Sequence, residues 1–509
     1  MRVYGIDLGT TYSCIAYVDD VGRPSVVRLD ESDTMASVVY FERPDHVVVG
    51  ESAKEALRDN PALVQSLIKR DMGKAGVTHE FWGRAYTPEQ ISAEILKKVA
   101  AEASATASEP VRDVVITVPA YFGIAEREAT KKAGELAGLN VIEILSEPVA
   151  AAISYESLKD GGDRTILVFD LGGGTFDTTV ITMRDGNITV VCTDGDHDLG
   201  GADWDSELAD YLIAEFRKQH PDASDPAEDP ETAAAVLLDA ERTKRNLTGA
   251  LTQRPKVIHD ARTATVEVSR EKFEELTASL LNRALDITAR TLETARSKGV
   301  TSYDEVLLVG GSTKMPAVKQ RLTAEFGFDP KLFDPDLAVA KGAALFAFEE
   351  TYRQLLAQGG AAAAQATQMA AQAGISESEQ QAMAKRVVRT VASRSFGVIV
   401  FDTDRKREYA DHLVHANDAL PASKSEQYYT LEDNQTTVRV RVVEQAGAIE
   451  SDEPGDNEEI IAGEIAIPRG KPRGWPVQVT FDMDRSGMLH VTAVERETSK
   501  TLELHVQTR

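Results

Sequence analysis

Short β-branched runs alternate with helical stretches along the first 349 residues of the chain. Strand-like apolar runs cover residues 2–6, 14–18, 114–118, 165–170, 178–183 and 305–309. Stretches with helical periodicity cover residues 88–104, 124–137, 202–219, 231–247, 270–298 and 316–326. This alternation predicts an α/β arrangement with layered helices and mixed sheets.

The pattern changes twice in the last third of the chain. Residues 357–374 form an Ala/Gln-rich tract without a clear apolar face, so we expect a flexible or weakly helical connector there. Ser376 followed by Glu379 is a capping-box pattern, which predicts a short helix. From about residue 391, apolar and polar residues alternate, which predicts an antiparallel β-sandwich. We therefore expect an α/β domain over 1–349, a linker over 350–390 and a β domain over 391–509.

Composition limits the classes of partner. The chain has 56 Lys and Arg against 82 Asp and Glu, a net charge of −26, so its surface repels nucleic acids and anionic membranes. We expect neither as a partner. No apolar run approaches the roughly 18 residues of a membrane helix, and the N-terminus has no signal-peptide pattern. Cys14 and Cys192 both lie in apolar runs, which predicts buried thiols in a cytoplasmic protein.

A glycine-rich hairpin pattern occurs twice. GIDLGTTYSCIAYV at 5–18 and VFDLGGGTFDTTVIT at 168–182 share a strand, Asp-Leu, a Gly-rich turn with Thr, and a second strand. Glycine lets backbone N–H groups approach phosphate oxygens closely. Asp7 and Asp170 occupy matching positions, and two carboxylates facing each other across a cleft would need a cation such as Mg²⁺. A single copy is typical of an ordinary hairpin, but two copies predict a nucleotide cleft.

Two further patterns bear on this cleft. VLLVGGSTKMPAVKQRL at 306–322 reads as strand, turn and helix, which would place N–H groups beside a nucleotide. It matches neither a Walker A loop nor a GxGxxG fingerprint, which excludes P-loop and Rossmann folds. On the predicted helix 231–247, the polar residues at i, i+3, i+4 and i+7 share one face, a pattern that alone is typical of a solvated face.

At this point the motifs resemble a known family. LGTTYSCIA, FDLGGGTFD and LLVGGSTKMP look like the three signature segments of the 70-kilodalton heat-shock (DnaK-type) chaperones. The resemblance continues at 68–73, 117–139, 146–155, 240–247 and 334–344, and in the β domain at 431–435 and 480–495. It implies an actin-like ATPase fold of two duplicated lobes, followed by a peptide-binding β-sandwich, with ATP or ADP and Mg²⁺ as cofactors.

The resemblance also implies roles for individual residues. The phosphate hairpins would be lined by Thr10, Thr11, Tyr12, Gly172, Gly173, Gly174 and Thr175. Asp7 and Asp170 would hold Mg²⁺ through water, and the attacking water would be positioned by Lys69, Glu147, Asp177 and Thr175. Adenosine would be gripped by Glu241, Lys244, Arg245 and Thr248 and, from the opposite wall, by Gly310, Gly311, Ser312, Lys314 and Asp336.

Two further sets concern the second domain. Pro119 and Arg127 match the family's relay between the nucleotide and the β domain. The groove for extended apolar peptides would be lined by Tyr428, Leu431, Val438 and Val440. An ordinary sandwich core is the alternative for these four positions, because Val438, Val440 and Val442 share one face of a strand by alternation.

Several features depart from the family pattern. We expect the chain to lack the helical lid that follows the β domain in this family, and we therefore expect bound peptide to exchange quickly. The family's Leu-rich linker is replaced by the Ala/Gln tract and RVVRTVASRSF at 386–396, in which Val387, Val388 and Val391 are candidates to dock on the ATPase domain. Glu143 stands where the family presents an arginine to J-domain cochaperones, so we expect an ordinary J-domain contact to be weak. The segment 73–87 is shorter than in the family.

The favoured interpretation is an ATP-dependent chaperone that hydrolyses ATP to control the binding of unfolded or extended apolar polypeptide segments. The alternative is an ATP-binding scaffold or regulator of the same fold that acts on one specific protein partner. A sugar or small-molecule kinase shares the cleft, but the GGGTFD hairpin, Lys69 and the β domain argue against it. A nucleotide-exchange factor stays open as a further partner.

Overall fold

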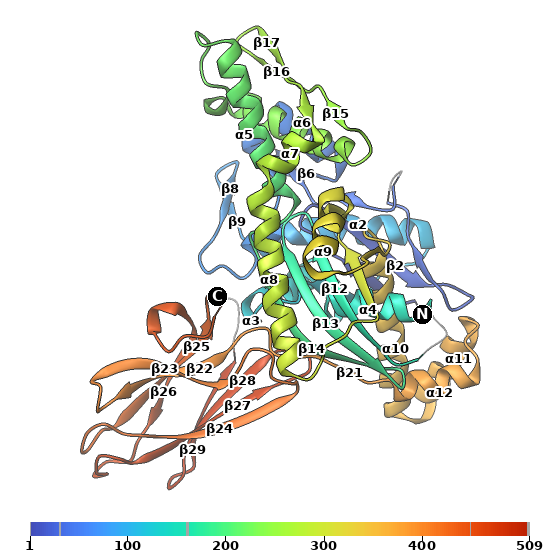
Figure 1. The fold of residues 1–509 in the computed structure, drawn as a ribbon. Helices are drawn as coiled ribbons and strands as arrows, with labels where there is room; N and C mark the ends of the chain where they lie inside the picture. The colour runs from blue at the N-terminus through green and yellow to red at the C-terminus, as the bar shows by residue number, and fades with distance from the viewer. Residues whose placement is uncertain (1, 30–31, 159–161, 448, 506–509) are drawn as a thin grey trace.

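The computed structural model of the chain describes residues 2–29, 32–158, 162–447 and 449–505. They form an α/β part and a β part, the latter drawn in orange and red at the lower left of Figure 1. The linker helices α11 (Gly360–Gln372) and α12 (Glu377–Lys385) lie on the α/β part, at the end away from the β part (Figure 1). Two six-stranded sheets form the centre of the α/β part.

The two central sheets repeat one unit. In the first, β1 pairs antiparallel with β2 and parallel with β10; in the second, β12 pairs antiparallel with β13 and parallel with β19. The first sheet comprises β1 (Tyr4–Asp7), β2 (Tyr12–Val18), β3 (Pro24–Val26), β4 (Met35–Ala36), β10 (Asp113–Val118) and β11 (Asn140–Ser146). The second comprises β12 (Arg164–Leu171), β13 (Phe176–Arg184), β14 (Asn187–Asp196), β19 (Glu305–Val309), β20 (Lys331–Leu332) and β21 (Val388–Arg389). The predicted fold of two duplicated lobes is confirmed.

Two helices join the lobes at the centre of the molecule. α10 (Ala338–Gln358) packs against β1, β2 and α4 (Glu147–Glu156). A Cβ on Gly5 would lie 2.2 Å from the amide nitrogen of Ala344, and one on Gly342 would lie 1.7 Å from the carbonyl oxygen of Ala150. Because any side chain would collide with backbone at both points, glycine permits these close contacts.

The outer helices follow the predictions closely. They are α2 (Pro88–Ala107), α3 (Ile124–Leu136), α5 (Gly201–Gln219), α6 (Pro230–Leu247) and α9 (Pro316–Phe326). The helix predicted over 270–298 is instead divided into α7 (Arg270–Leu276) and α8 (Ala278–Ser297). The break lies at Thr277, whose φ is −103° and whose hydroxyl donates to the carbonyl of Phe273 at 2.9 Å. No helix in the described part of the chain is long and apolar enough to cross a membrane.

Smaller elements cover the outer ends of the lobes. In the first lobe these are β5 (Val39–Arg43), β6 (His46–Val49), α1 (Glu51–Glu55), β7 (Val64–Gln65), β8 (His79–Phe81) and β9 (Arg84–Tyr86). In the second they are β15 (Thr252–Gln253), β16 (Lys256–His259), β17 (Arg262–Thr265) and β18 (Val268–Ser269). α1 and α6 approach each other from the two lobes, and Lys54 of α1 forms an ion pair with Glu241 of α6.

The Ala/Gln-rich tract forms a helix, one of the two forms predicted for it, but the prediction that it has no clear apolar face was wrong. α11 (Gly360–Gln372) buries Ala366, Met369 and Ala370 against the core that includes α10. Their i, i+3, i+4 spacing is that of a helix face, but all apolar residues of the tract except Met369 are alanine, so the pattern gives little contrast between faces. α12 (Glu377–Lys385) follows and begins with the predicted capping box.

The segment after α12 docks on the second sheet. Val388 and Arg389 form β21, which pairs in parallel with β14. The N–H of Val387 donates to Oδ1 of Asn187 at 2.9 Å, and Val388 and Val391 pack against the core of the α/β part. The predicted docking of Val387, Val388 and Val391 is therefore confirmed, and the chain adds a strand to the second central sheet before it enters the β part.

The β part is an antiparallel sandwich, as the alternation predicted. One sheet has the order β23-β22-β25-β26 and the other β24-β27-β28-β29. The strands are β22 (Phe396–Asp402), β23 (Arg407–Val414), β24 (Ala422–Tyr429), β25 (Thr437–Gln445), β26 (Asn457–Ala466), β27 (Pro476–Met483), β28 (Leu489–Glu495) and β29 (Lys500–His505). Apolar residues from both sheets form one core, with Ile124 of α3 packed against it from the α/β part.

Candidate active site

Two Gly-rich turns meet between the central sheets. A Cβ on Gly174 would lie 2.2 Å from Cγ2 of Thr10, and one on Gly173 would lie 2.0 Å from Oγ1 of Thr11. The β1–β2 and β12–β13 turns thus contact each other only because these two glycines have no side chains. A cleft of about 340 Å³ lies beside the two turns.

Nearly all residues predicted for the nucleotide site line this cleft. They are Asp7, Thr10, Thr11, Tyr12, Lys69, Glu147, Asp170, Gly172, Gly173, Thr175, Glu241, Lys244, Arg245, Thr248, Gly310, Gly311, Ser312, Lys314 and Asp336. The predicted residues Gly174 and Asp177 lie outside this lining. Gly174 packs on Thr10, and its carbonyl accepts hydrogen bonds from Arg70 at 2.8 and 3.0 Å. Asp177 is buried, with 1% of its surface exposed.

The acids Asp7 and Asp170 face the cleft from the ends of β1 and β12. Burial raises the pKa of Asp7 to about 7, and the charge of Glu147 adds to this shift. Burial and the charges of Glu147 and Asp177 raise the pKa of Asp170 well above its usual range. A divalent cation fits this pair, because its positive charge would lower the pKa of both carboxyl groups and let both ionise. Among the described residues no three Asp, Glu, His or Cys side chains converge as a metal site, so such a cation would need phosphate and water oxygens as well.

Lys69 and Glu147 form a buried ion pair on the cleft wall. Lys69 lies in a short 3-10 helix, Ile68–Asp71, and Glu147 begins α4. The Nζ atom of Lys69 lies 2.6 Å from Oε1 of Glu147, and Lys69 is 4% exposed. The pair puts a fixed cation and a carboxylate side by side next to Asp7 and Asp170, where phosphate charge would be neutralised.

The carboxyl group of Asp177 is held behind the second turn. Its Oδ1 accepts the backbone N–H of Tyr121 at 2.9 Å. Burial and then the charge of Glu147 raise the pKa of Asp177 to about 8, against the effect of the Tyr121 hydrogen bond. In the β12–β13 hairpin, Asp177 is the register partner of Asp170. A carboxyl group whose pKa lies near neutrality is suited to exchange a proton at neutral pH.

An ion pair that the sequence did not reveal bridges the two lobes. Lys54 of α1 places Nζ 2.6 Å from Oε2 of Glu241 on α6. The same ammonium donates to the Tyr12 hydroxyl at 2.8 Å, and Nη1 of Arg245 donates to that hydroxyl at 3.1 Å. The sequence points to Lys54 only indirectly. Glu241 lies on the polar face of the predicted helix 231–247, and a carboxylate that faces the cleft would need a cation as its partner.

Other polar side chains predicted for the nucleotide site form hydrogen bonds or ion pairs with residues of the same chain. Nζ of Lys244 lies 2.8 Å from Oδ2 of Asp205 and 2.6 Å from the carbonyl oxygen of Gly201. On the opposite wall, the Ser312 hydroxyl donates to the carbonyl of Gly172 at 2.8 Å. Lys314 and Asp336 form an ion pair beside it on the same wall. Asp205 is a further member of the cleft lining that sequence comparison of motifs did not single out.

The two predicted relay residues lie close to the contact between the α/β part and the β part. Nη1 of Arg127 on α3 donates to the carbonyl of Ser486 in the β27–β28 turn at 3.3 Å, and its Nε donates to the carbonyl of Phe122 at 3.0 Å. The carbonyl of Pro119 accepts the N–H of Phe122 at 3.2 Å. The predicted relay pair is therefore connected through Phe122, and Arg127 contacts the β part directly.

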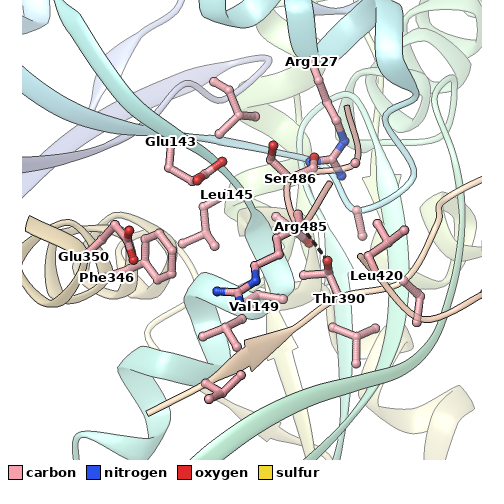
Figure 2. Close-up of a pocket in the computed structure, with 18 of the residues that line it drawn as sticks. Arg127, Glu143, Leu145, Val149, Phe346, Glu350, Thr390, Leu420, Arg485 and Ser486 are labelled. Atoms are coloured by element: carbon pink, nitrogen blue, oxygen red, sulfur yellow. Dashed lines mark hydrogen bonds between the residues drawn. The ribbon is translucent and has the colours of Figure 1, made fainter. Parts of the chain in front are cut away.

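A cavity of about 440 Å³ lies between the two domains and the linker (Figure 2). Glu143 of β11 and Arg485 of the β27–β28 turn both line it, and the Thr390 hydroxyl donates to the carbonyl of Arg485 at 2.8 Å. Burial and then the charge of Asp484 raise the pKa of Glu143 to about 7. The position that we expected to face a cochaperone therefore faces the β part of the same chain.

The four predicted peptide-groove residues divide between core and surface. Val440 is 4% exposed and belongs to the sandwich core, while Val438 and Tyr428 are half-buried against it. The Tyr428 hydroxyl donates to Oδ2 of Asp411 at 2.8 Å. Leu431 is 43% exposed. The shared face of Val438 and Val440 thus turns toward the core, as alternation requires.

Comparisons with known proteins agree with the motifs. The chain is 36% identical to the chaperone protein DnaK of Deinococcus proteolyticus over 538 positions, which cover 99% of this chain and 79% of the relative. It is equally 36% identical, with the same coverage, to the chaperone proteins DnaK of Deinococcus radiodurans and Deinococcus deserti. A family model described as Hsp70 protein matches residues 3–81, 58–348 and 361–509. The chain therefore belongs to the DnaK-type Hsp70 family.

Proposed function

We propose that this chain is a molecular chaperone that hydrolyses ATP to control its binding of unfolded or extended apolar polypeptide segments. The main support is the cleft in which Asp7, Asp170 and the Lys69–Glu147 pair lie beside two Gly-rich turns. Membership of the Hsp70 family and similarity to proteins named chaperone protein DnaK point the same way.

The phosphate end of the cleft suits ATP with Mg²⁺. The backbone N–H groups of the two turns would bind phosphate oxygens. Asp7 and Asp170 would hold Mg²⁺ through water, and the cation would supply neutralisation of phosphate charge. Transfer of a phosphoryl group to water depends mainly on positioning and on charge neutralisation. Lys69 would offset the negative charge that develops on the transferred group.

The proton of the attacking water needs an acceptor. The two candidates are Glu147 on the cleft wall and Asp177 behind the second turn, whose pKa is raised to about 8. Thr175 lines the cleft and would orient the water with Lys69. The adenosine would lie between the α6 side chains Glu241, Lys244, Arg245 and Thr248 and the wall of Gly310, Gly311, Ser312, Lys314 and Asp336.

The β part would bind the polypeptide. An extended segment would contact Tyr428, Leu431 and Val438 and bond to the backbone of a strand. The contacts of Arg127 with Ser486 and of β21 with β14 would couple that binding to the nucleotide. Since Glu143 is turned into the interdomain cavity, the proposal also includes a weak ordinary J-domain contact.

A dedicated scaffold that acts on one protein partner is the second candidate. The observation that favours it is the burial of Val440 in the sandwich core and the hydrogen bond of Tyr428 to Asp411. Both remove predicted groove positions from an open surface. Such a protein would keep the ATP cleft but would lack general affinity for apolar peptides.

One titration separates the two candidates. Fluorescence anisotropy of a labelled Leu/Val-rich peptide is measured with Mg·ATP and with Mg·ADP, alongside phosphate release. Weaker peptide binding with ATP, together with phosphate release, is the result expected of the chaperone. Phosphate release without peptide binding in either state would favour the scaffold. Failure to bind ATP at all would contradict both.

A further inference from the structure

A buried cluster of charged side chains joins the domains away from the cleft. Arg394, just before β22, is 7% exposed. Its guanidinium lies 3.3 Å from Oε1 of Glu126 on α3 and 3.6 Å from Oε1 of Glu444 on β25. It also donates to Nε2 of His197. One arginine of the β part is therefore enclosed by groups from both domains.

Arg394 provides the charge around which this cluster is arranged. Burial and then the charge of Arg394 lower the pKa of His197 to about 3, so the imidazole is neutral and accepts the hydrogen bond. Burial raises the pKa of Glu444 to about 8, while Arg394 opposes that shift. Removing the arginine would leave buried carboxyl groups without their cation, which is costly.

The cluster contacts the segment that holds Asp177. The Arg394 guanidinium lies 5.0 Å from the centroid of the Tyr121 ring, and the His197 ring centroid also lies 5.0 Å from it. The Tyr121 ring is thus flanked by two members of the cluster. The backbone N–H of the same tyrosine donates to Oδ1 of Asp177 at 2.9 Å. A single residue therefore connects the β part to a buried carboxylate next to the cleft.

The packing around this connection is tight. A Cβ on Gly195 would lie 2.8 Å from Oδ1 of Asp177 and 3.0 Å from Cβ of Tyr121. There is no room between these groups for even a methyl group. Because close-packed groups transmit displacement, a shift of Tyr121 would move the Asp177 carboxylate.

We propose that Arg394 is a positioning residue for the ATPase site. By holding Tyr121 in place, it fixes the N–H that orients the Asp177 carboxylate, so hydrolysis depends on the docked β part. This inference rests on the proposed function, in which Asp177 is one of the two candidates to accept the proton of the attacking water. It differs from the predicted relay of Pro119 and Arg127, because the controlling side chain comes from the β part.

The first test uses hydrogen–deuterium exchange on the nucleotide-free full chain. Arg394→Ala is expected to speed exchange of the Tyr121 amide by about tenfold, because its hydrogen bond opens more often. Arg394→Lys, which keeps the charge, should recover part of the protection. The control is Arg407→Ala, which removes an exposed pair with Asp452 and Glu453 elsewhere in the β part and should leave Tyr121 unchanged.

The second test separates positioning from binding. In single-turnover hydrolysis, Arg394→Ala is expected to lower the rate by about tenfold while the Kd for Mg·ATP changes less than about twofold. Arg394→Lys should restore part of the rate. In a Tyr121→Ala background the Arg394 substitution should add little, because both act through one contact.

The results can contradict the proposed function or the role of Arg394 alone. A wild-type chain that binds but does not hydrolyse ATP would overturn the proposed function and the kinetic role of Arg394 with it. An active wild-type chain whose Arg394→Ala variant keeps both the Tyr121 exchange and the turnover rate would overturn the role of Arg394 alone. Equal losses from Arg394→Ala with and without the Tyr121 ring would also overturn it.

Discussion

The ammonium of Lys69 lies 2.6 Å from a carboxylate oxygen of Glu147, and Lys69 is almost fully buried. Their elements come from different parts of the chain, a short 3-10 helix and the start of α4. Together with Asp7 and Asp170 the pair lines the part of the cleft in which we propose that phosphate binds. A buried cation in such a place has its largest effect on charge that develops during reaction.

Replacing Lys69 should therefore remove catalysis more than binding. Lys69→Met keeps the length of the side chain but not its charge, and we expect the turnover rate to fall by about 10²–10³-fold. The Kd for Mg·ATP, from fluorescence of a labelled nucleotide, should change far less. Lys74→Ala, which removes an exposed pair with Asp71, is the matched control. A wild-type turnover rate in the Lys69→Met chain would contradict the proposed catalytic role of Lys69.

The ion pair between Lys54 and Glu241 predicts a different effect. It connects α1 of one lobe to α6 of the other, so it must break when the cleft opens. Lys54→Ala should speed ADP release by about tenfold, since a partly buried pair contributes roughly 1 kcal/mol or more to the closed state. Stopped-flow displacement of a fluorescent ADP measures this rate. Lys97→Ala, which breaks a surface pair with Glu94 on α2, should release ADP at the wild-type rate. Equal release from both variants would show that the bridge does not hold the cleft closed.

The two Gly-rich turns could be predicted from the sequence because their residue pattern is local. Each hairpin carries its Asp, glycines and Thr within a few residues, and the repeat of the pattern gave the second lobe. Lys54 and Arg394 could not be found in this way. Their partners Glu241 and Glu126 lie 187 and 268 residues away along the chain, and only the fold brings them together.

At three other places the residue types did not reveal the structure or what covers a face. The buried face of α11 consists of Ala366, Met369 and Ala370, and alanine occurs on buried and exposed helix faces alike. The break at Thr277 was missed because its side-chain hydrogen bond to Phe273 leaves no mark on the helical periodicity. In β25, alternation predicted the shared face of Val438 and Val440 but not whether core or ligand covers it.

The packing of α11 predicts that the linker contributes to stability. Met369→Asp would place a carboxylate in the core beside α10, and we expect it to destabilise the α/β part by roughly 2–4 kcal/mol. Urea unfolding followed by circular dichroism would show the lower midpoint. Gln368→Asp adds the same charge at the neighbouring exposed position and should have little effect. If both variants had the same urea midpoint as the wild type, α11 would not be part of the folded core.

Glu143 predicts that domain docking depends on pH. In the docked chain the pKa of Glu143 is raised to about 7 from an ordinary 4.5, partly by Asp484 of the β part. The docked state therefore binds this proton more tightly than the undocked state. Its contribution to docking is full below pH 4.5 and is lost as the pH rises through 7. His197 acts in the opposite sense, because its pKa is lowered to about 3 and protonation from pH 6.5 downward opposes docking.

The substitution Glu143→Gln isolates the first of these effects. The amide keeps the shape but cannot ionise, so docking should be stronger than wild type at pH 8 and should vary less between pH 6 and 8. Energy transfer between dyes on cysteines introduced at the exposed positions Asp59 and Lys424 would report docking. The native thiols will not compete for label, because Cys14 and Cys192 are at most 1% exposed, as their sequence context predicted.

Glu135→Gln is the matched control for Glu143→Gln, since Glu135 is an exposed carboxylate on α3. It should keep the wild-type dependence on pH. If Glu143→Gln kept that dependence as well, the titrating group would lie elsewhere in the interface. Glu444, whose pKa is raised to about 8 beside Arg394, would then be the group to replace, because it too loses its buried surroundings when the domains separate.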